Sequence, residues 1–213
     1  LVPVGAVQVP AIVNTVAVSE TMTRTCPFPV PPVMTTNFPT RAVLFTVHVA
    51  PESHNDLAAV KTAIRLAGRL CDGVQINATW PAPEAIAEAT GRNCKRVVLQ
   101  LRDYMDVQGH LLAHAVDSYQ GVITDILLDA SCGAGVDVTR LQERTGRAIA
   151  EIRKIAPWCG VGCAGGLSSV SLPNLKPLRD EHPGLNLDAE SALRDGQDWL
   201  STGKAIAYVR AAA

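Results

Sequence analysis

From residue 41 onward, short apolar runs alternate with segments in which apolar residues recur every three or four positions. The runs are typical of buried strands, and the recurring pattern is typical of amphipathic helices. The predicted strands span 41–49, 73–78, 96–101, 123–129, 160–165 and 185–190. The predicted helices span 55–70, 83–91, 107–120, 138–155, 169–178 and 200–212. This alternation predicts a parallel sheet with helical crossovers, because parallel neighbours need a long connection.

Two α/β architectures fit six successive strand–helix units. One is an open doubly wound sheet, and the other is a closed (β/α)8 barrel of the TIM type. In both, strands covered on each face have continuously apolar sequences, as these strands do. We favour a single TIM-type barrel domain over residues 1–213, with room for irregularity in its first two strands.

Residues 1–40 do not follow the alternating pattern. The stretch TCPFPVPPVMTTNFP (25–39) holds five prolines, which exclude a regular helix or a central strand. We therefore expect an irregular proline-rich segment that serves as a lid or an interface arm. An arm of this composition can pack against a second copy of the chain, which would give a homodimer.

Composition and charge argue against some classes of binding partner and favour one cellular compartment. The net charge is −1 without clusters of Lys and Arg, which argues against a nucleic-acid surface. No apolar run approaches the roughly 20 residues that span a bilayer, so no membrane partner is expected. The six scattered cysteines indicate reduced thiols and a cytoplasmic protein. Cys159 and Cys163 have no second pair at zinc spacing, and His110 and His114 lack a third ligand, so neither a metal nor another cofactor is expected.

Candidate chemistry gathers where the predicted strands end, because ligands of parallel sheets bind at the carboxyl ends of the strands. Asp129 ends an apolar run and precedes a glycine loop, so it is the first candidate for an acid or base, and His48 is the second. Side chains or backbone that would bind substrate come from Asn77, Arg102, Gly133 and Gly135.

Each candidate also has a structural interpretation. Asp129 can cap the next turn, the glycines can supply only a positive φ, and His48 can be a buried structural histidine. Asp188 and Glu190 lie two residues apart and share one face of a strand. They would form an acid–base pair at a barrel mouth, but a solvated face is the favoured interpretation.

Several stretches resemble phosphoribosylanthranilate isomerase, a (β/α)8 barrel, over roughly residues 41–213. They are GVQINATWP, ILLDASCGAGVDVTR, CAGGLSSVSLPNL, LNLDAESALRDG and GKAIAYVRAA. The resemblance implies an Amadori rearrangement of a phosphoribosyl amine, with Asp129 as the acid. It also implies a phosphate site on the backbone near Gly165, Gly166, Glu190 and Ser191, in the loops after the last two strands.

The chain departs from that family in two motifs. The family's first-strand Lys-Ile-Cys-Gly, which supplies a cysteine base, has no counterpart, and Cys26 stands in a different context. The family's eighth strand ends in Ser-Gly-Val-Glu, where this chain has residues 189–192, Ala-Glu-Ser-Ala. Two hypotheses therefore remain open. One is an isomerase or lyase acting on a small phosphorylated sugar or related metabolite, and the other is a catalytically silent barrel that binds a metabolite or a protein partner.

Overall fold

The computed structural model describes residues 17–19, 42–44, 46–49, 57–58, 61, 73–78, 80–91, 94, 96–102, 104, 107–129, 138–197 and 199–212. The strands are β1 (Ala17–Ser19), β2 (Ala42–Leu44), β3 (Thr46–Val49), β4 (Gly73–Ile76), β5 (Arg96–Leu101), β6 (Asp125–Asp129), β7 (Gly160–Ala164) and β8 (Asn186–Leu187). The α-helices are α3 (Pro83–Thr90), α4 (Gly109–Asp117), α5 (Gln142–Ile155), α6 (Lys176–Glu181) and α7 (Thr202–Ala212). Within these ranges the 3-10 helices are η3 (Val138–Arg140), η4 (Leu172–Leu175) and η5 (Ser191–Leu193).

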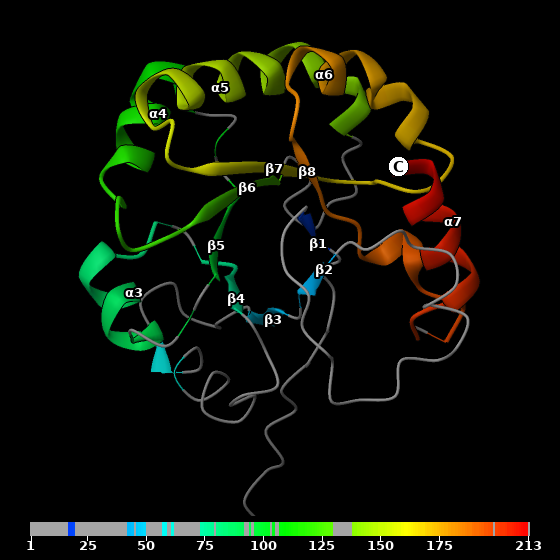
Figure 1. Cartoon of the computed structure of the whole chain (residues 1–213), viewed down its shortest axis with the longest axis horizontal. Helices are drawn as coiled ribbons and strands as arrows, with labels where there is room; N and C mark the ends of the chain where they lie inside the picture. Colours follow the sequence, from blue (N-terminus) through cyan, green and yellow to red (C-terminus); the bar gives the residue numbers. More distant parts are fainter. Residues whose placement is uncertain are drawn as a thin grey trace, which may run out of the picture.

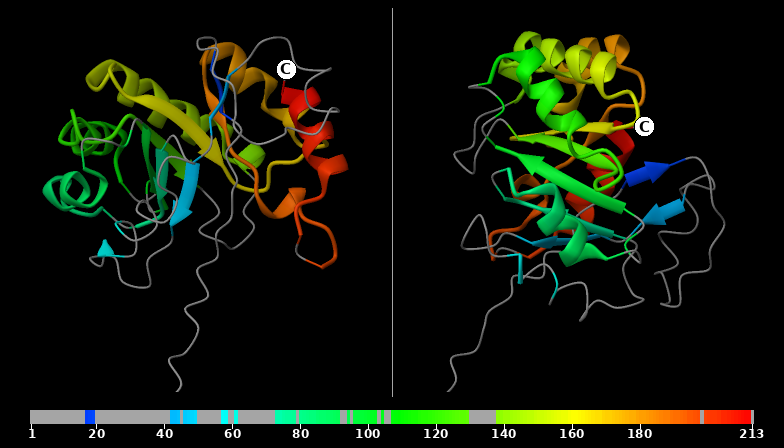
Figure 2. Two further views of the ribbon diagram at one scale, coloured as in Figure 1. Left: turned by 60° about the horizontal axis from the view of Figure 1, so that its bottom comes forward. Right: turned by 90° about the vertical axis from the view of Figure 1, so that its left-hand side faces the viewer.

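Strands β3 to β8 form one six-stranded sheet in which the spatial order is the sequence order and every pair is parallel. Figure 1 shows the strands at the centre of the molecule and the helices outside them, and Figure 2 shows the same arrangement from two other sides. The prediction of an α/β fold with a parallel sheet is confirmed. The strand order does not reverse at a switch point as in a doubly wound sheet, so the sheet is compatible with a TIM-type fold.

The predicted strand over 41–49 is wrong as a single element. It divides after Leu44 into β2, which pairs antiparallel with β1 in a separate two-stranded sheet, and β3, which joins the parallel sheet. The apolar run continues through the division, so hydrophobicity alone could not show it. The predicted helix over 55–70 lies almost wholly outside the described residues.

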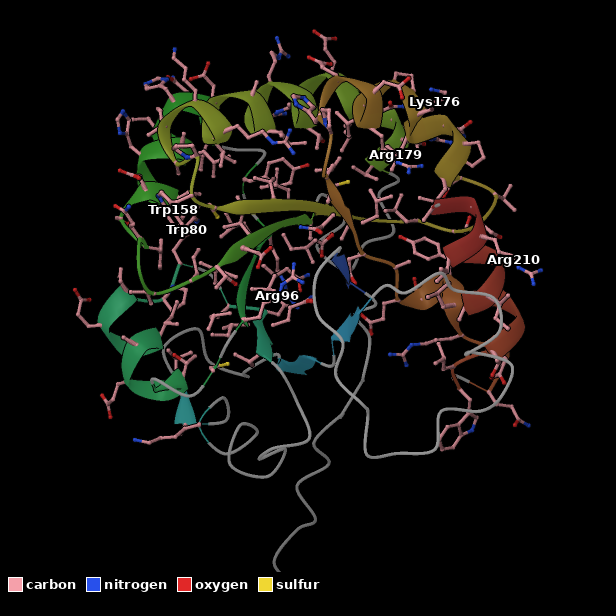
Figure 3. The ribbon with its side chains drawn as sticks, viewed as in Figure 1. Trp80, Arg96, Trp158, Lys176, Arg179 and Arg210 are labelled. Carbon is pink, nitrogen blue, oxygen red and sulfur yellow. The ribbon has the colours of Figure 1, made fainter. Side chains whose placement is uncertain are left out.

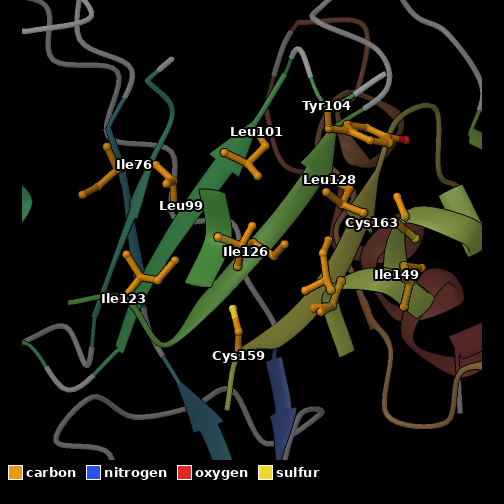
Figure 4. Close-up of a cluster of buried hydrophobic side chains, with 14 of the residues drawn as sticks. Ile76, Leu99, Leu101, Tyr104, Ile123, Ile126, Leu128, Ile149, Cys159 and Cys163 are labelled. Carbon is orange, nitrogen blue, oxygen red and sulfur yellow. The ribbon is translucent and has the colours of Figure 1, made fainter. Parts of the chain in front are cut away.

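The main core lies between the outer face of the sheet and the helices. Alternate strand residues such as Leu99, Leu101 and Leu128 are at most 2 % exposed, and they pack with Ile149 of α5. Figure 4 shows these side chains on one face of the strands. Burying each such side chain stabilises the fold by roughly 1.5–3 kcal/mol relative to leaving it in water.

The opposite, inner face of the sheet carries a second, small apolar cluster of Val98, Leu127 and Ala164. Val98 pairs in register with Asp125, and Leu127 pairs with Gly162. Leu127 thus lies two residues after Asp125, the partner of Val98. In the same way, Ala164 lies two residues after Gly162, the partner of Leu127. Such a stagger arises when the strands of a curved sheet tilt relative to its axis, as they do in barrels.

A largely buried ion pair lies at the amino end of this inner face. The Arg96 guanidinium donates two hydrogen bonds to the Asp125 carboxylate, from Nε to Oδ2 over 2.9 Å and from Nη2 to Oδ1 over 2.8 Å. The two side chains are only 16% and 12% exposed. Figure 3 shows Arg96 on the inner side of the curved sheet. Bidentate geometry of this kind is among the stronger polar contacts in proteins.

The absence of a side chain at Gly160 of β7 makes space for the Asp125 carboxylate of this ion pair. A Cβ atom at Gly160 would overlap Oδ1 and Cγ of Asp125. Gly160→Ala must therefore displace the carboxylate or the strand, and we expect the free energy of unfolding to fall by about 1–3 kcal/mol. Urea unfolding measures this loss.

The matched control is Gly196→Ala, where a Cβ meets no atom within 4 Å and no left-handed φ is required. That substitution should change stability by less than about 0.5 kcal/mol. Equal effects of the two substitutions would contradict the packing of Gly160 against Asp125.

Candidate active site

Asp129 is the last residue of β6 and lies at the carboxyl end of the sheet, as the sequence predicted. It is only 6 % exposed, and its Oδ2 accepts a hydrogen bond from Nε2 of Gln100 on β5, over 2.7 Å. Buried carboxylates are costly unless they are hydrogen-bonded, and this amide donor meets that need.

Gln100 is in turn held by Gln75 of β4, whose Nε2 donates to Gln100 Oε1 over 3.1 Å. Gln75 pairs in register with Val98, and Gln100 pairs with Leu127. Gln100 lies two residues after the partner of Gln75, and Asp129 lies two residues after the partner of Gln100. This is the offset found in the inner apolar cluster, and Gln100 and Asp129 each lie two residues closer to the carboxyl end than the cluster residue on the same strand. The strand register therefore brings three polar side chains next to one another on the inner face of the curved sheet.

Gln75 also makes a side-chain hydrogen bond to Asp188, the residue after β8. Strands β5, β6 and β7 separate β4 from β8 in the sheet, so this bond crosses the inner side of the sheet. A flat sheet would hold the two strands far apart, because neighbouring strands are spaced by about 4.8 Å. The curvature of the sheet therefore brings Asp188 close to Gln75, whose amide is hydrogen-bonded to Gln100, the partner of Asp129.

The environment of Asp188 favours its protonated form. Burial, and after it the negative charges of Glu190 and Asp129, raise the pKa of Asp188 to about 7, and the Gln75 hydrogen bond opposes them in part. Asp188 is partly buried, so it is less solvated than the sequence suggested, because strand parity alone does not say which face is desolvated. Glu190 is partly buried and forms an ion pair with Arg194 over 2.7 Å.

The predicted phosphate-binding glycines form a turn after β7. Gly165 and Gly166 have φ values of 117° and 61°, which favour glycine because a Cβ is strained there. Ser171 Oγ donates to the Gly166 carbonyl over 3.2 Å, and the Val138 N–H donates to the Gly165 carbonyl over 3.2 Å. Ser191, the other predicted contact, is exposed at the first residue of η5.

The remaining predicted residues lie along the same edge or outside the described part of the chain. Asn77 follows β4 and is 9 % exposed, and its Oδ1 has no hydrogen-bond partner among the described residues. Arg102 follows β5 and is partly buried. His48 lies in β3, where its backbone is the register partner of Gln75. Gly133 and Gly135 fall outside the described residues.

Neither Gln75 nor Gln100 was predicted as a site residue, although both contact the carboxylates directly. Each is a polar residue inside an otherwise apolar strand, and each is followed two positions later by another polar residue, Asn77 or Arg102. That period-two pattern places both members of a pair on one strand face. This spacing of polar residues could have predicted that the inner face of the sheet is polar near the carboxyl ends of β4 and β5.

The described cysteines and histidines do not gather into a metal centre. Over the described ranges, no group of three or more His, Cys, Asp or Glu side chains is arranged to hold a metal ion. Burial raises the pKa of the Cys159 and Cys163 thiols to about 12, so neither is a ready thiolate. His110 and His114 are both exposed on α4.

Comparison with known protein families and with curated proteins finds no match to this chain. Over the part of the chain that the structure describes, no helix combines the length and the hydropathy needed to cross a membrane.

The raised pKa of Asp188 predicts a stability that depends on pH. Because the folded protein holds this proton more tightly than the unfolded chain, ionisation of Asp188 destabilises the fold progressively between about pH 4 and pH 7. Asp188→Asn removes that penalty. Its stability relative to the wild type should rise between pH 4 and pH 8 by about 2–4 kcal/mol, since one pKa unit corresponds to about 1.4 kcal/mol.

Urea unfolding at both pH values measures this difference, with Asp180→Asn as the control. Asp180 pairs with Lys176 on the surface, and its side chain is 63% exposed. The control should show little change with pH. A wild type and Asp188→Asn that respond identically to pH would rule out a desolvated Asp188.

Proposed function

We propose that this protein is an isomerase or lyase that acts on a small phosphorylated sugar or related metabolite. We also propose that its sheet closes into a (β/α)8 barrel resembling that of phosphoribosylanthranilate isomerase. The observation that carries the proposal is the pair of carboxylates at the carboxyl end of the sheet, Asp129 and Asp188, linked through two buried glutamines. In parallel α/β folds this end is where substrates bind.

Two carboxylates suit an aldose–ketose type of isomerisation, which requires one proton to be given and one to be taken. One carboxylic acid gives its proton to the ring oxygen as the C1–O bond breaks. The nitrogen or oxygen substituent on C1 forms a double bond to C1 as the ring bond breaks. A carboxylate then takes the proton from C2, the electrons of the C–H bond form the C1–C2 double bond, and the electrons of the C1–heteroatom double bond return to the heteroatom. A proton added at C1 and the loss of the C2 hydroxyl proton give the ketone, without any oxidant or reductant. Positioned acids and bases of this kind accelerate reactions by about 10²–10⁴-fold each.

The environment of Asp188 supports this assignment. With its pKa raised to about 7 by burial, Asp188 exists in both protonation states near neutral pH. A group with a pKa near the working pH is the most effective general acid or base. In this proposal Asp129 exchanges one proton with the substrate and Asp188 exchanges the other, a role that a cysteine fills in the resembled family. His48 remains a further catalytic candidate.

The phosphate would be held by the backbone around Gly165 and Gly166. Their left-handed conformations and the missing Cβ atoms let an anion approach the chain closely. Asn77 and Arg102, at the same edge, would orient the sugar. Contacts from Gly133, Gly135, Glu190 and Ser191 remain predictions, as do a homodimer and a cytoplasmic location.

A thermal-melting assay tests the phosphate site. A ligand that binds only the folded state stabilises it by roughly 2.7 kcal/mol at one hundred times its dissociation constant. We expect aldose phosphates and inorganic phosphate to raise the melting temperature of the wild type. The shift should vanish in Gly166→Asp, which places a negative charge at the turn.

The matched control is Gly166→Asn, which has nearly the same shape without the charge and tolerates a positive φ equally well. It should keep most of the shift. If no phosphorylated compound stabilises the wild type, the phosphate site is wrong, and the catalytically silent barrel becomes the better hypothesis.

A further inference from the structure

The short helix α6 and the residue after it pack against α5 at a glycine. Gly146 is a buried residue of α5, and α6 lies beside that helix (Figure 1). A Cβ atom at Gly146 would lie 3.2 Å from Cδ1 of Leu178 and 3.4 Å from Nε2 of His182. Glycine inside a helix costs roughly 0.5–1 kcal/mol relative to alanine. Here its missing side chain lets a leucine and a histidine approach the backbone of α5.

His182 belongs to this packed contact and is not a surface group. The residue is only 5 % exposed, and its Nε2 has no hydrogen-bond partner of good geometry among the described residues. Its main-chain N–H donates to the Leu178 carbonyl over 3.0 Å, at the end of α6. Leu178 itself is 2 % exposed. An imidazole in such a place is tolerated more readily in its neutral form than in its charged form.

Charged groups of both helices face His182. On its own side of the contact, Oε1 of Glu181 lies 3.9 Å from Nε2, and the Glu181 side chain is 70% exposed. On α5, Arg153 donates from Nη2 to the carbonyl of Pro183, the next residue, over 2.9 Å. Burial has the largest effect and lowers the pKa of His182. The Glu181 charge opposes this shift of the pKa, the Arg153 charge adds to it, and the Gly146 backbone opposes it.

We propose that the contact between α5 and α6 at His182 is a pH-sensitive switch, in which the neutral imidazole holds α6 against α5 and the protonated imidazole releases it. The inference goes beyond the proposed function and does not depend on it. A charged imidazole needs hydration, which it gains when the end of α6 separates from α5. The released state takes up the proton first as the pH falls below about 6.5, the ordinary pKa of histidine, so acid favours release.

Helix α6 is suited to local release because it is short. It has six residues, and a helix of that length depends on packing for its stability. Leu175 and Leu178 hold it to the core, and Arg179 donates from Nη2 to the Ala212 carbonyl of α7. The leucines carry no charge, and an arginine keeps its charge at all pH values near neutrality. Of the described groups at this contact, His182 is the one whose ordinary pKa is nearest to neutral.

Native-state amide hydrogen exchange of the full chain, followed by mass spectrometry on peptides from α6, tests the switch. Exchange is compared at about pH 7.5 and about pH 5, on either side of the ordinary histidine pKa, after correction for the intrinsic rate at each pH. In the wild type, the protection of α6 should be at least about threefold lower at the acidic pH, and that of β5 and β6 should fall less. Protonation of Asp188 cannot cause this loss, because it stabilises the fold.

His182→Gln keeps a neutral polar side chain of similar size, so α6 should be protected equally at both pH values in this variant. Glu181→Gln gives an independent result on an exposed side chain, and it decides the question if His182→Gln does not fold. Without the Glu181 charge His182 is harder to protonate, so the midpoint of the loss should move to lower pH. His114→Gln is the matched control, since His114 is exposed on α4, and it should respond as the wild type does.

Three results would overturn the inference. The first is equal protection of α6 at both pH values in the wild type, or a loss that is equal in α6 and in the central strands. The second is the wild-type loss persisting in His182→Gln. The third is an unchanged midpoint in Glu181→Gln.

Discussion

The hydrogen bond between Gln75 and Asp188 depends on the curvature of the whole parallel sheet. It joins a residue of β4 to the residue after β8, across three intervening strands. The contact exists because the strands tilt and the sheet curves, so that β4 and β8 face each other across its inner side. The site is therefore a property of the sheet as a whole, and no single loop creates it.

The inner face divides into three levels with different physical roles. At the amino end, Arg96 and Asp125 neutralise each other in a buried, bidentate pair. In the middle, Val98, Leu127 and Ala164 fill the space with apolar atoms. At the carboxyl end, the polar groups are two carboxylates and two amides, and burial leaves one carboxylate with a pKa near neutrality. Among the described residues, this last level combines desolvation with two carboxylates that can exchange protons, which is the combination that acid–base catalysis uses.

The sequence predicted the order of strands and helices well, because buried strands and amphipathic helices differ in period. It also placed Asp129, Asn77 and Arg102 at strand ends, where the structure has them. It did not reveal that the apolar run over 41–49 contributes to two sheets, because pairing partners are not encoded in local hydrophobicity. It also missed the bond between Gln75 and Asp188, since 112 residues of chain lie between them and only the curvature of the sheet brings them together.

The most direct test of the account is turnover of phosphoribosylanthranilate and a panel of aldose phosphates by the wild type, Asp129→Asn and Asp188→Asn. Asp195→Asn, at an exposed position of the loop before α7, is the control. We expect isomerisation by the wild type and the control, and a loss of at least about 10²-fold in both site variants, which should remain folded. Undiminished turnover without either carboxylate, or no turnover of any of these compounds by the wild type, would contradict it.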